Sequence, residues 1–170
     1  MLAPPVFAAD FALTSTDIVS GQRLNQAQVL NGFGCTGANI SPHLAWTDPP
    51  AGTKSFVITV YDPDAPTGSG WWHWVVFDIP STVRSLDAGA SRDKTKLPAG
   101  SVESRTDFGA PGFGGACPPP GAKPHRYIFK ITALKVEKLD LPADASAALV
   151  GYMTNLNALT SAQIEATYGR

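Results

Sequence analysis

The chain has 170 residues, of which 16% are charged, and its formal net charge is −1. This length predicts one ordinary domain that buries a substantial core. Because lysines and arginines are scattered, the composition argues against nucleic acid as a partner. No apolar run approaches the roughly 20 residues of a membrane-spanning helix.

Residues 1–9 differ from the rest of the chain. They are apolar, and the small residues Ala8 and Ala9 stand just before the first strand-like segment. This composition is typical of the end of a secretory signal peptide, with residues 6–8 as a small-x-small cleavage site. A disordered N-terminal tail is the alternative. We expect a single domain over residues 10–170.

Short apolar runs separated by Gly, Pro, Asn and Asp dominate the chain after residue 10. Such runs, rich in β-branched and aromatic residues, predict a mostly antiparallel β architecture. Apolar and polar residues alternate only partly within the central runs, which is typical of strands covered on both faces. The predicted strands span residues 11–14, 44–46, 55–61, 74–79, 126–135 and 164–168.

One helix is predicted over residues 146–159, with Asp144 as its N-terminal cap. Residues 86–100 are expected to hold a turn of helix or no regular structure. The glycine- and proline-rich residues 101–121 are long enough to be a functional loop. Five apolar side chains of the helix recur at helical spacing and are expected to pack on the sheet: Leu149, Tyr152, Met153, Leu156 and Leu159.

The segment after residues 55–61 concentrates polar and aromatic groups. It contains Asp62 and Asp64, followed by Trp71 and His73. Its prolines fix φ near −65° and lack an N–H, so we predict a stiff loop suited to a preformed pocket. The alternative is that both aspartates cap backbone amides of a turn.

A second Gly- and Pro-rich segment, residues 112–127, brings further polar groups to the start of the next predicted strand. It ends in a histidine, an arginine and a tyrosine. The backbone amides of Gly114, Gly115 and Ala116 are predicted to point inward as an anion-binding nest.

The two cysteines, Cys35 and Cys117, both lie in glycine-rich loops. A bridge between them would close a loop of about eighty residues and stabilise the fold by roughly 4–5 kcal/mol in the chain-entropy model. Two buried free thiols of a cytoplasmic protein are the alternative. The leader-like N-terminus favours the disulfide, and with it a periplasmic or secreted location.

Three motifs, in this order and at this separation, resemble the phosphatidylethanolamine-binding protein (PEBP) family, in particular its bacterial, Raf-kinase-inhibitor-like branch. They are Asp-Pro-Asp-Ala-Pro at 62–66, Trp-His at 72–73 and Pro-His-Arg-Tyr at 124–127. The resemblance extends over about residues 11–168. It implies an antiparallel β-sandwich-like fold with a large central sheet and one or two peripheral helices near the C-terminus. It also implies that residues 101–121 close over a small anion pocket and that Arg126 is structural. The implied pocket residues are Asp62, Asp64, Trp71, His73, Pro119, His125 and Tyr127.

These residue types suit an anionic or zwitterionic ligand, such as a phosphate ester or a phospholipid head group. His73 and His125 can donate ring N–H groups, and Tyr127 can donate its hydroxyl. Asp62 and Asp64 would repel phosphate oxygens. We therefore expect them to orient the imidazoles or to hold an amine such as ethanolamine.

We expect a binding or regulatory protein rather than an enzyme, with no cofactor and no metal. The resemblance further implies a kinase or protease as a protein partner, a peripheral lipid contact and a homodimer. One alternative is a hydrolase of a small ester or phosphoester, in which an aspartate orients His73 as a base. The other is a metal site, which the lack of closely spaced His or Cys ligands disfavours.

Overall fold

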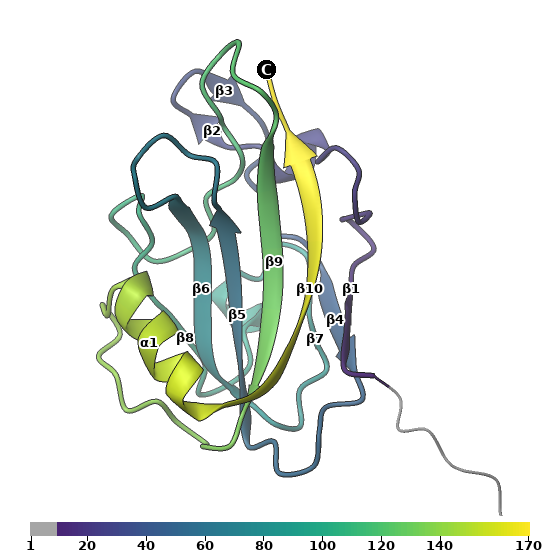
Figure 1. Ribbon diagram of the computed structural model, residues 1–170, viewed down its shortest axis with the longest axis vertical. Coiled ribbons are helices and arrows are strands. Elements are labelled where there is room, and N and C mark those ends of the chain that lie inside the picture. Colours follow the sequence, from purple (N-terminus) through teal and green to yellow (C-terminus); the bar gives the residue numbers. More distant parts are fainter. Residues whose placement is uncertain (1–9) are drawn as a thin grey trace, which may run out of the picture.

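The computed structural model describes residues 10–170, so the expected signal-peptide remnant at residues 1–9 lies outside the described residues. The chain folds mainly into antiparallel strands, which confirms the predicted β-rich architecture (Figure 1). Its central sheet has five strands in the order β10 (Ala158–Tyr168), β9 (His125–Leu134), β5 (Ser55–Asp62), β6 (Trp71–Pro80) and β8 (Val102–Glu103).

The shorter elements surround this sheet. Short 3-10 turns form at Gln26–Gln28 and Lys94–Lys96. The second turn agrees with the prediction for residues 86–100. A small sheet contains β1 (Ala12–Thr14), β4 (Leu44–Thr47) and β7 (Ser85–Leu86), a hairpin contains β2 (Asn31–Gly32) and β3 (Cys35–Thr36), and helix α1 spans Ala147–Asn157.

Both faces of the central sheet are buried, which explains the partial alternation in its sequence. Successive strand residues face opposite sides. Phe56 and Ile58 of β5 therefore join the core shared with the small sheet, where Trp46 meets Phe56 edge-on with ring centroids 5.4 Å apart. Val57, between them, joins a second core beneath α1. The sheet is thus covered by strands on one side and by the helix on the other.

Helix α1 forms as predicted, but the prediction of its cap and of its packing face was wrong. Ser146, not Asp144, caps the helix by accepting a hydrogen bond from the amide of Leu149. The face that meets the sheet carries Ala147, Val150 and Thr154. The side chains of Val57, Val75 and Phe77 already cover this face of the sheet, so small helix residues such as Ala147 fit against it. Of the predicted stripe, Leu149, Tyr152 and Leu156 are exposed, and Leu159 lies beyond the helix in β10. The half-buried Met153 packs against the core beneath the helix, as predicted.

Termini of three central strands lie together at one end of the sheet, where the strands begin or end. β5 ends at Asp62, β6 begins at Trp71 and β9 begins at His125. Because β5 runs antiparallel to both β6 and β9, the C-terminal end of β5 lies beside the N-terminal ends of β6 and β9. These ends lie next to the β2–β3 hairpin (Figure 1). Within residues 10–170, no helix has the length and apolar character that crossing a membrane requires.

Candidate functional site

His73 lies at an irregularity of β6. Trp71 and His73 were predicted to be in a loop, but β6 begins at Trp71 and contains both. Trp72 pairs with Tyr61 and Trp74 pairs with Val60, so His73 has no Cα partner on β5. A β-bulge of this kind redirects a side chain and is common next to functional sites.

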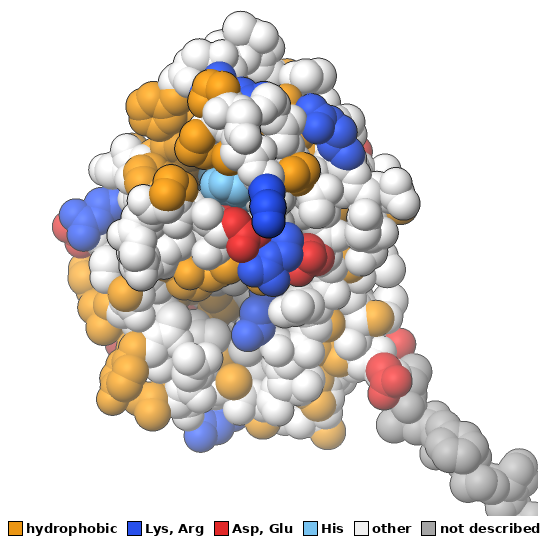
Figure 2. All heavy atoms as spheres, turned by 45° about the horizontal axis from the view of Figure 1, so that its top comes forward, with side chains coloured by type: hydrophobic (Ala, Val, Ile, Leu, Met, Phe, Trp, Pro, Cys, Tyr) orange, Lys and Arg blue, Asp and Glu red, His pale blue; other side chains and the backbone are white. Residues whose placement is uncertain are grey.

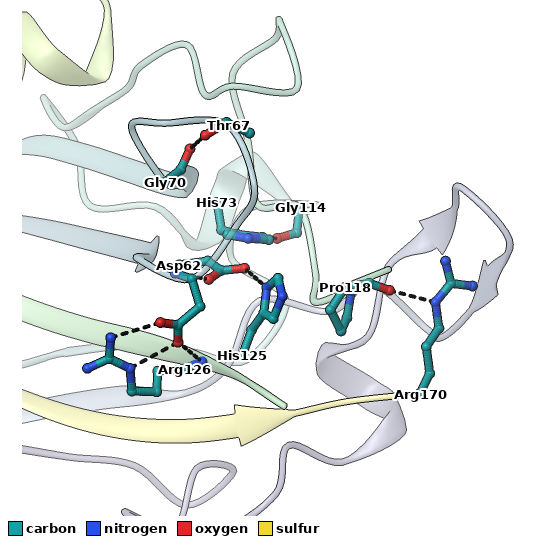
Figure 3. A network of polar contacts seen from close by, with 10 residues as sticks. Asp62, Thr67, Gly70, His73, Gly114, Pro118, His125, Arg126 and Arg170 are labelled. Atoms are coloured by element: carbon teal, nitrogen blue, oxygen red, sulfur yellow. Dashed lines mark hydrogen bonds and ion pairs between the residues drawn. The ribbon is translucent and has the colours of Figure 1, made fainter. Parts of the chain in front are cut away.

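Asp62 and His125 form a buried pair at the ends of β5 and β9. Oδ2 of Asp62 lies 2.7 Å from Nδ1 of His125, and the two residues are 3% and 6% exposed. Oδ1 of Asp62 accepts a hydrogen bond of 2.8 Å from the amide of Asp64. Asp62 therefore orients the imidazole, as predicted, and also caps the turn, as the alternative proposed. Figure 3 shows the carboxylate directed at the ring.

Asp64 was predicted to bind ligand, but the structure turns it away from the pocket. Because Arg126 follows His125 on a strand, it points to the opposite face. Its Nε and Nη2 donate to the two carboxylate oxygens of Asp64 at 2.9 and 2.8 Å (Figure 3). The hydrogen bond from Arg126 lowers the pKa of Asp64 to about 2. This outer pair fastens the loop after β5 to β9.

The imidazole of His73 is held in one tautomer. Its Nδ1 lies 2.7 Å from the carbonyl oxygen of Gly114, which can only accept, so Nδ1 carries the proton. Burial lowers the pKa of His73 below its ordinary value of 6.5, although the Gly114 carbonyl opposes this shift. The ring is therefore neutral at physiological pH, and Nε2 presents a lone pair.

The predicted anion nest is corrected by the structure, because all three backbone amides already donate within the protein. Gly114 donates to the carbonyl of His73 at 2.9 Å. Gly115 donates to Oδ1 of Asn39 at 2.7 Å, and Ala116 donates to the carbonyl of Gln28 at 3.0 Å. Gly115 and Ala116 thus hold the loop in place and lie outside the cavity lining.

A cavity of about 200 Å³ opens at this end of the sheet. Six of the nine predicted ligand-binding residues line it: Asp62, Trp71, His73, Pro119, His125 and Tyr127. The wall is completed by residues that were not predicted, namely Phe33, Ala65, Pro66, Thr67, Phe108, Cys117 and Pro118. Segments far apart in the chain therefore share one cavity.

Three side chains of this lining contain a buried polar atom that has no hydrogen-bond partner within residues 10–170. These atoms are Nε2 of His73, the hydroxyl of Tyr127 and Nε1 of Trp71. Burial raises the pKa of Tyr127, and the negative charge of Asp62 raises it further, so the hydroxyl keeps its proton. The cavity thus combines two donors, from Tyr127 and Trp71, with one acceptor, from His73.

A disulfide and the hydrogen bonds of one arginine hold the segments beside the cavity opening together. A disulfide joins Cys35 of the β2–β3 hairpin to Cys117 of the long loop, with Cα atoms 6.0 Å apart and a sequence separation of 82. Arg170 donates from Nε to the carbonyl of Pro118 at 2.7 Å (Figure 3). Its two Nη atoms donate to the carbonyls of Gly34 and Phe33 at 3.1 and 3.2 Å. Hairpin and loop are therefore held together beside the opening.

Phe33 and Phe108 are the main lining residues that the sequence analysis missed. Phe33 stands two positions before Cys35, and Cys117 belongs to the second polar segment. The disulfide, used as a distance constraint, would have placed Phe33 beside the pocket. Phe108 lies within residues 101–121, the loop whose length already indicated a functional role.

The fold and the site define a class: a β-rich protein with a small, partly polar cavity at one end of its central sheet. Comparison with known proteins identifies the family. The family model for phosphatidylethanolamine-binding proteins matches residues 14–169. The chain belongs to this family, which confirms the resemblance seen in its motifs.

Relatives of the chain support this assignment. It is 57% identical to the UPF0098 protein YbcL of Escherichia coli K12 over 162 residues, which are 95% of this chain and 88% of YbcL. It is 51% identical to YbhB of the same organism over 156 residues, or 92% and 98% of the two chains. The crystal structure of E. coli YbcL, described as a member of the mammalian PEBP family, matches with a TM-score of 0.93 and 56% identity. The match covers 95% of this chain and 99% of that one. CT736 of Chlamydia trachomatis, described as a PEBP homologue, matches with a TM-score of 0.79 and 27% identity, covering 94% and 97%.

Proposed function

We propose that this protein binds small ligands that carry a phosphoryl group, such as phosphate monoesters and phospholipid head groups, and acts as a binding or regulatory protein. The observation that carries the proposal is a set of three buried polar atoms around one cavity, on His73, Tyr127 and Trp71, that have no hydrogen-bond partner within residues 10–170. Buried polar groups in native proteins are almost always hydrogen bonded. A ligand that bonds to these atoms would supply the missing partners.

The chemistry of a phosphate monoester matches these atoms. Its oxygens accept from the Tyr127 hydroxyl and the Trp71 indole, and in its monoanionic form one oxygen carries a proton that can be donated to Nε2 of His73. Size supports the same ligand class. A volume of about 200 Å³ lies below the roughly 300–1,000 Å³ of sites for drug-sized ligands, which favours a head group or a small ester.

Tyr127→Phe tests this proposal because it removes only the unpartnered hydroxyl. We expect the affinity for methyl phosphate, measured by calorimetry, to fall about 10- to 100-fold, as when a hydrogen bond to a charged group is lost. The thermal midpoint should stay the same or rise, since a buried unpaired polar group disappears.

Tyr168→Phe is the matched control. Tyr168 is also buried, but it does not line the cavity, and its hydroxyl accepts a hydrogen bond of 3.5 Å from the side-chain amide of Gln26. The affinity of the Tyr168→Phe variant for methyl phosphate should equal that of the wild type. Unchanged affinity in Tyr127→Phe would reject the proposed site.

The Asp62–His125 pair favours hydrolysis of a small ester or phosphoester as a second candidate function. A carboxylate 2.7 Å from Nδ1 leaves Nε2 of His125 as an oriented base that could activate water. Turnover of p-nitrophenyl acetate or p-nitrophenyl phosphate that disappears in Asp62→Asn would support hydrolysis. Stoichiometric binding of methyl phosphate without turnover of either substrate would exclude it for this ester class.

We also propose that the protein works outside the cytoplasm. The Cys35–Cys117 disulfide supports this location, since such bonds persist mainly in oxidising compartments. Mass spectrometry of the protein alkylated without reduction, directly from its native cells, tests the location. Two alkylated thiols would contradict it.

A further inference from the structure

We propose that the β2–β3 hairpin makes this site selective for phosphate monoesters whose ester group is a planar ring, and that Phe33 is the residue that determines this selectivity. The inference rests on the proposed function, because the phosphoryl group would occupy the cavity while the ring leaves through its mouth.

Phe33 has a backbone conformation that phenylalanine rarely adopts. Only Phe33 and Gly34 separate the paired residues of the hairpin, and their φ angles are 50° and 81°. Positive φ at both central positions is the requirement of a type I′ turn, where Asn-Gly is favoured. A bulky residue there is a conformational outlier, and such strain occurs preferentially at ligand sites and switches.

Phe33 is also exposed where burial would be expected. The residue is 74% exposed, although it lines the cavity. Neither turn propensity nor core packing explains this side chain. Contact with the ring of a bound ester would explain why a phenylalanine stands at this position.

The rings around the mouth form a continuous series that leads inward. Phe33 stacks on Phe108 with centroids 6.1 Å apart and planes 16° apart. Phe108 meets Trp71 edge-on at 5.3 Å and His73 at 5.4 Å. The Phe108 ring lies directly over Gly114, where an added Cβ would come within 2.2 Å of it. The Phe108 ring can lie at this place because position 114 is a glycine, which has no Cβ.

The surface around the mouth has two different sides. Figure 2 shows hydrophobic side chains gathered on one side of a histidine, whereas Lys, Arg, Asp and Glu side chains lie on the other. Among the apolar lining residues are Phe33, Pro66, Pro118 and Pro119. A ring that leaves the cavity past Phe33 would lie against its side chain, and the disulfide and Arg170 already hold this hairpin in place. Such preorganisation lowers the cost of binding.

Calorimetry with phenyl phosphate and methyl phosphate on the purified chain tests the inference. We expect the wild type to bind phenyl phosphate about 2- to 10-fold more tightly, as expected for one aromatic pair. Cyclohexyl phosphate has the same number of carbon atoms without planarity, and it should bind more weakly than phenyl phosphate.

Phe33→Asn is the decisive variant, because asparagine suits the left-handed turn and lacks the ring. Its unfolding midpoint in urea should equal or exceed that of the wild type, and its affinity for phenyl phosphate should fall to its affinity for methyl phosphate, so that the preference disappears. Tyr152→Asn is the control. Tyr152 lies on α1, is 62% exposed and does not line the cavity, so this variant removes an aromatic side chain and should retain the preference.

Equal affinity of the wild type for phenyl and methyl phosphate would overturn the inference, as would a preference that survives in Phe33→Asn. Cyclohexyl phosphate binding as tightly as phenyl phosphate would overturn the requirement for a planar ring. In these outcomes methyl phosphate still binds, so the proposed function stands. If neither ester binds, the proposed function itself fails and the inference fails with it.

Discussion

The floor and the rim of the cavity are held in place by different physical means. The floor consists of Asp62, His73, His125 and Tyr127, all on strands whose positions are fixed by hydrogen bonds of the central sheet. The rim consists of Phe33, Phe108, Pro118 and Pro119, which lie outside the strands. A disulfide and one arginine side chain hold the rim together. Under the proposed function, the rigid sheet would therefore recognise the phosphoryl group, whereas the cross-linked loops would recognise the shape of its ester group.

Removing the disulfide should have the largest effect on stability. It should also show whether the rim and the floor contribute separately to ester binding. In the chain-entropy model, the double variant Cys35→Ser, Cys117→Ser loses about 4–5 kcal/mol of stability, because the bridge closes a loop of 82 residues. Urea unfolding measures this loss. Calorimetry below the thermal transition should show unchanged affinity for methyl phosphate and a loss of the preference for phenyl phosphate. Equal weakening of both esters would show that the rim also shapes the floor.

Asp62→Ala and Asp64→Ala compare a floor residue with a near neighbour that faces outward. Asp62→Ala should lower the free energy of unfolding by about 3 kcal/mol and abolish ester binding, because it leaves the buried His125 without its partner. Asp64→Ala should cost less than about 1 kcal/mol, since the Asp64 and Arg126 side chains are 32% and 50% exposed and solvent screens the pair. Comparable losses in the two variants would contradict the division into a buried and an outer pair.

Arg170→Ala tests the second cross-link of the rim. Three hydrogen bonds to the carbonyls of Phe33, Gly34 and Pro118 are lost, so we expect a decrease in stability of about 1–2 kcal/mol and a weaker preference for phenyl phosphate. Arg170→Lys should not restore the preference, because a single ammonium lacks the planar fork of donors. Arg126→Ala is the control, and it should leave the preference unchanged.

The strands were predictable from sequence because their apolar runs are long and bounded by glycine and proline. The site was predictable where motif residues stand at strand ends, as with Asp62 and His125. The outward direction of Asp64 was also within reach, because it follows from the alternation that places Arg126 on the face opposite to His125.

Other features required the three-dimensional structure. The anion nest was wrong because the partners of Gly115 and Ala116 are Asn39 and Gln28, more than seventy positions away in the chain. The prediction of the packing face of α1 was wrong because smaller residues such as Val150, rather than the largest apolar ones, fit the occupied surface of the sheet. In both cases the deciding contacts are between residues distant in sequence, which local patterns do not encode.

The smallest expected effect concerns the protonation of His73 in the floor. Burial lowers its folded-state pKa below the ordinary value of 6.5, so the unfolded chain binds a proton there more readily than the folded one. The stabilising contribution is therefore complete above about pH 6.5 and is lost as the pH falls below that value. We therefore expect this group to make the protein less stable at pH 5.5 than at pH 7. The Asp64–Arg126 pair adds nothing in this window, because the pKa of Asp64 is about 2. Urea unfolding at both pH values, in the wild type and in His73→Gln, measures the difference. An equal pH dependence in the variant would show that the imidazole of His73 is not the neutral, buried group that the cavity floor requires.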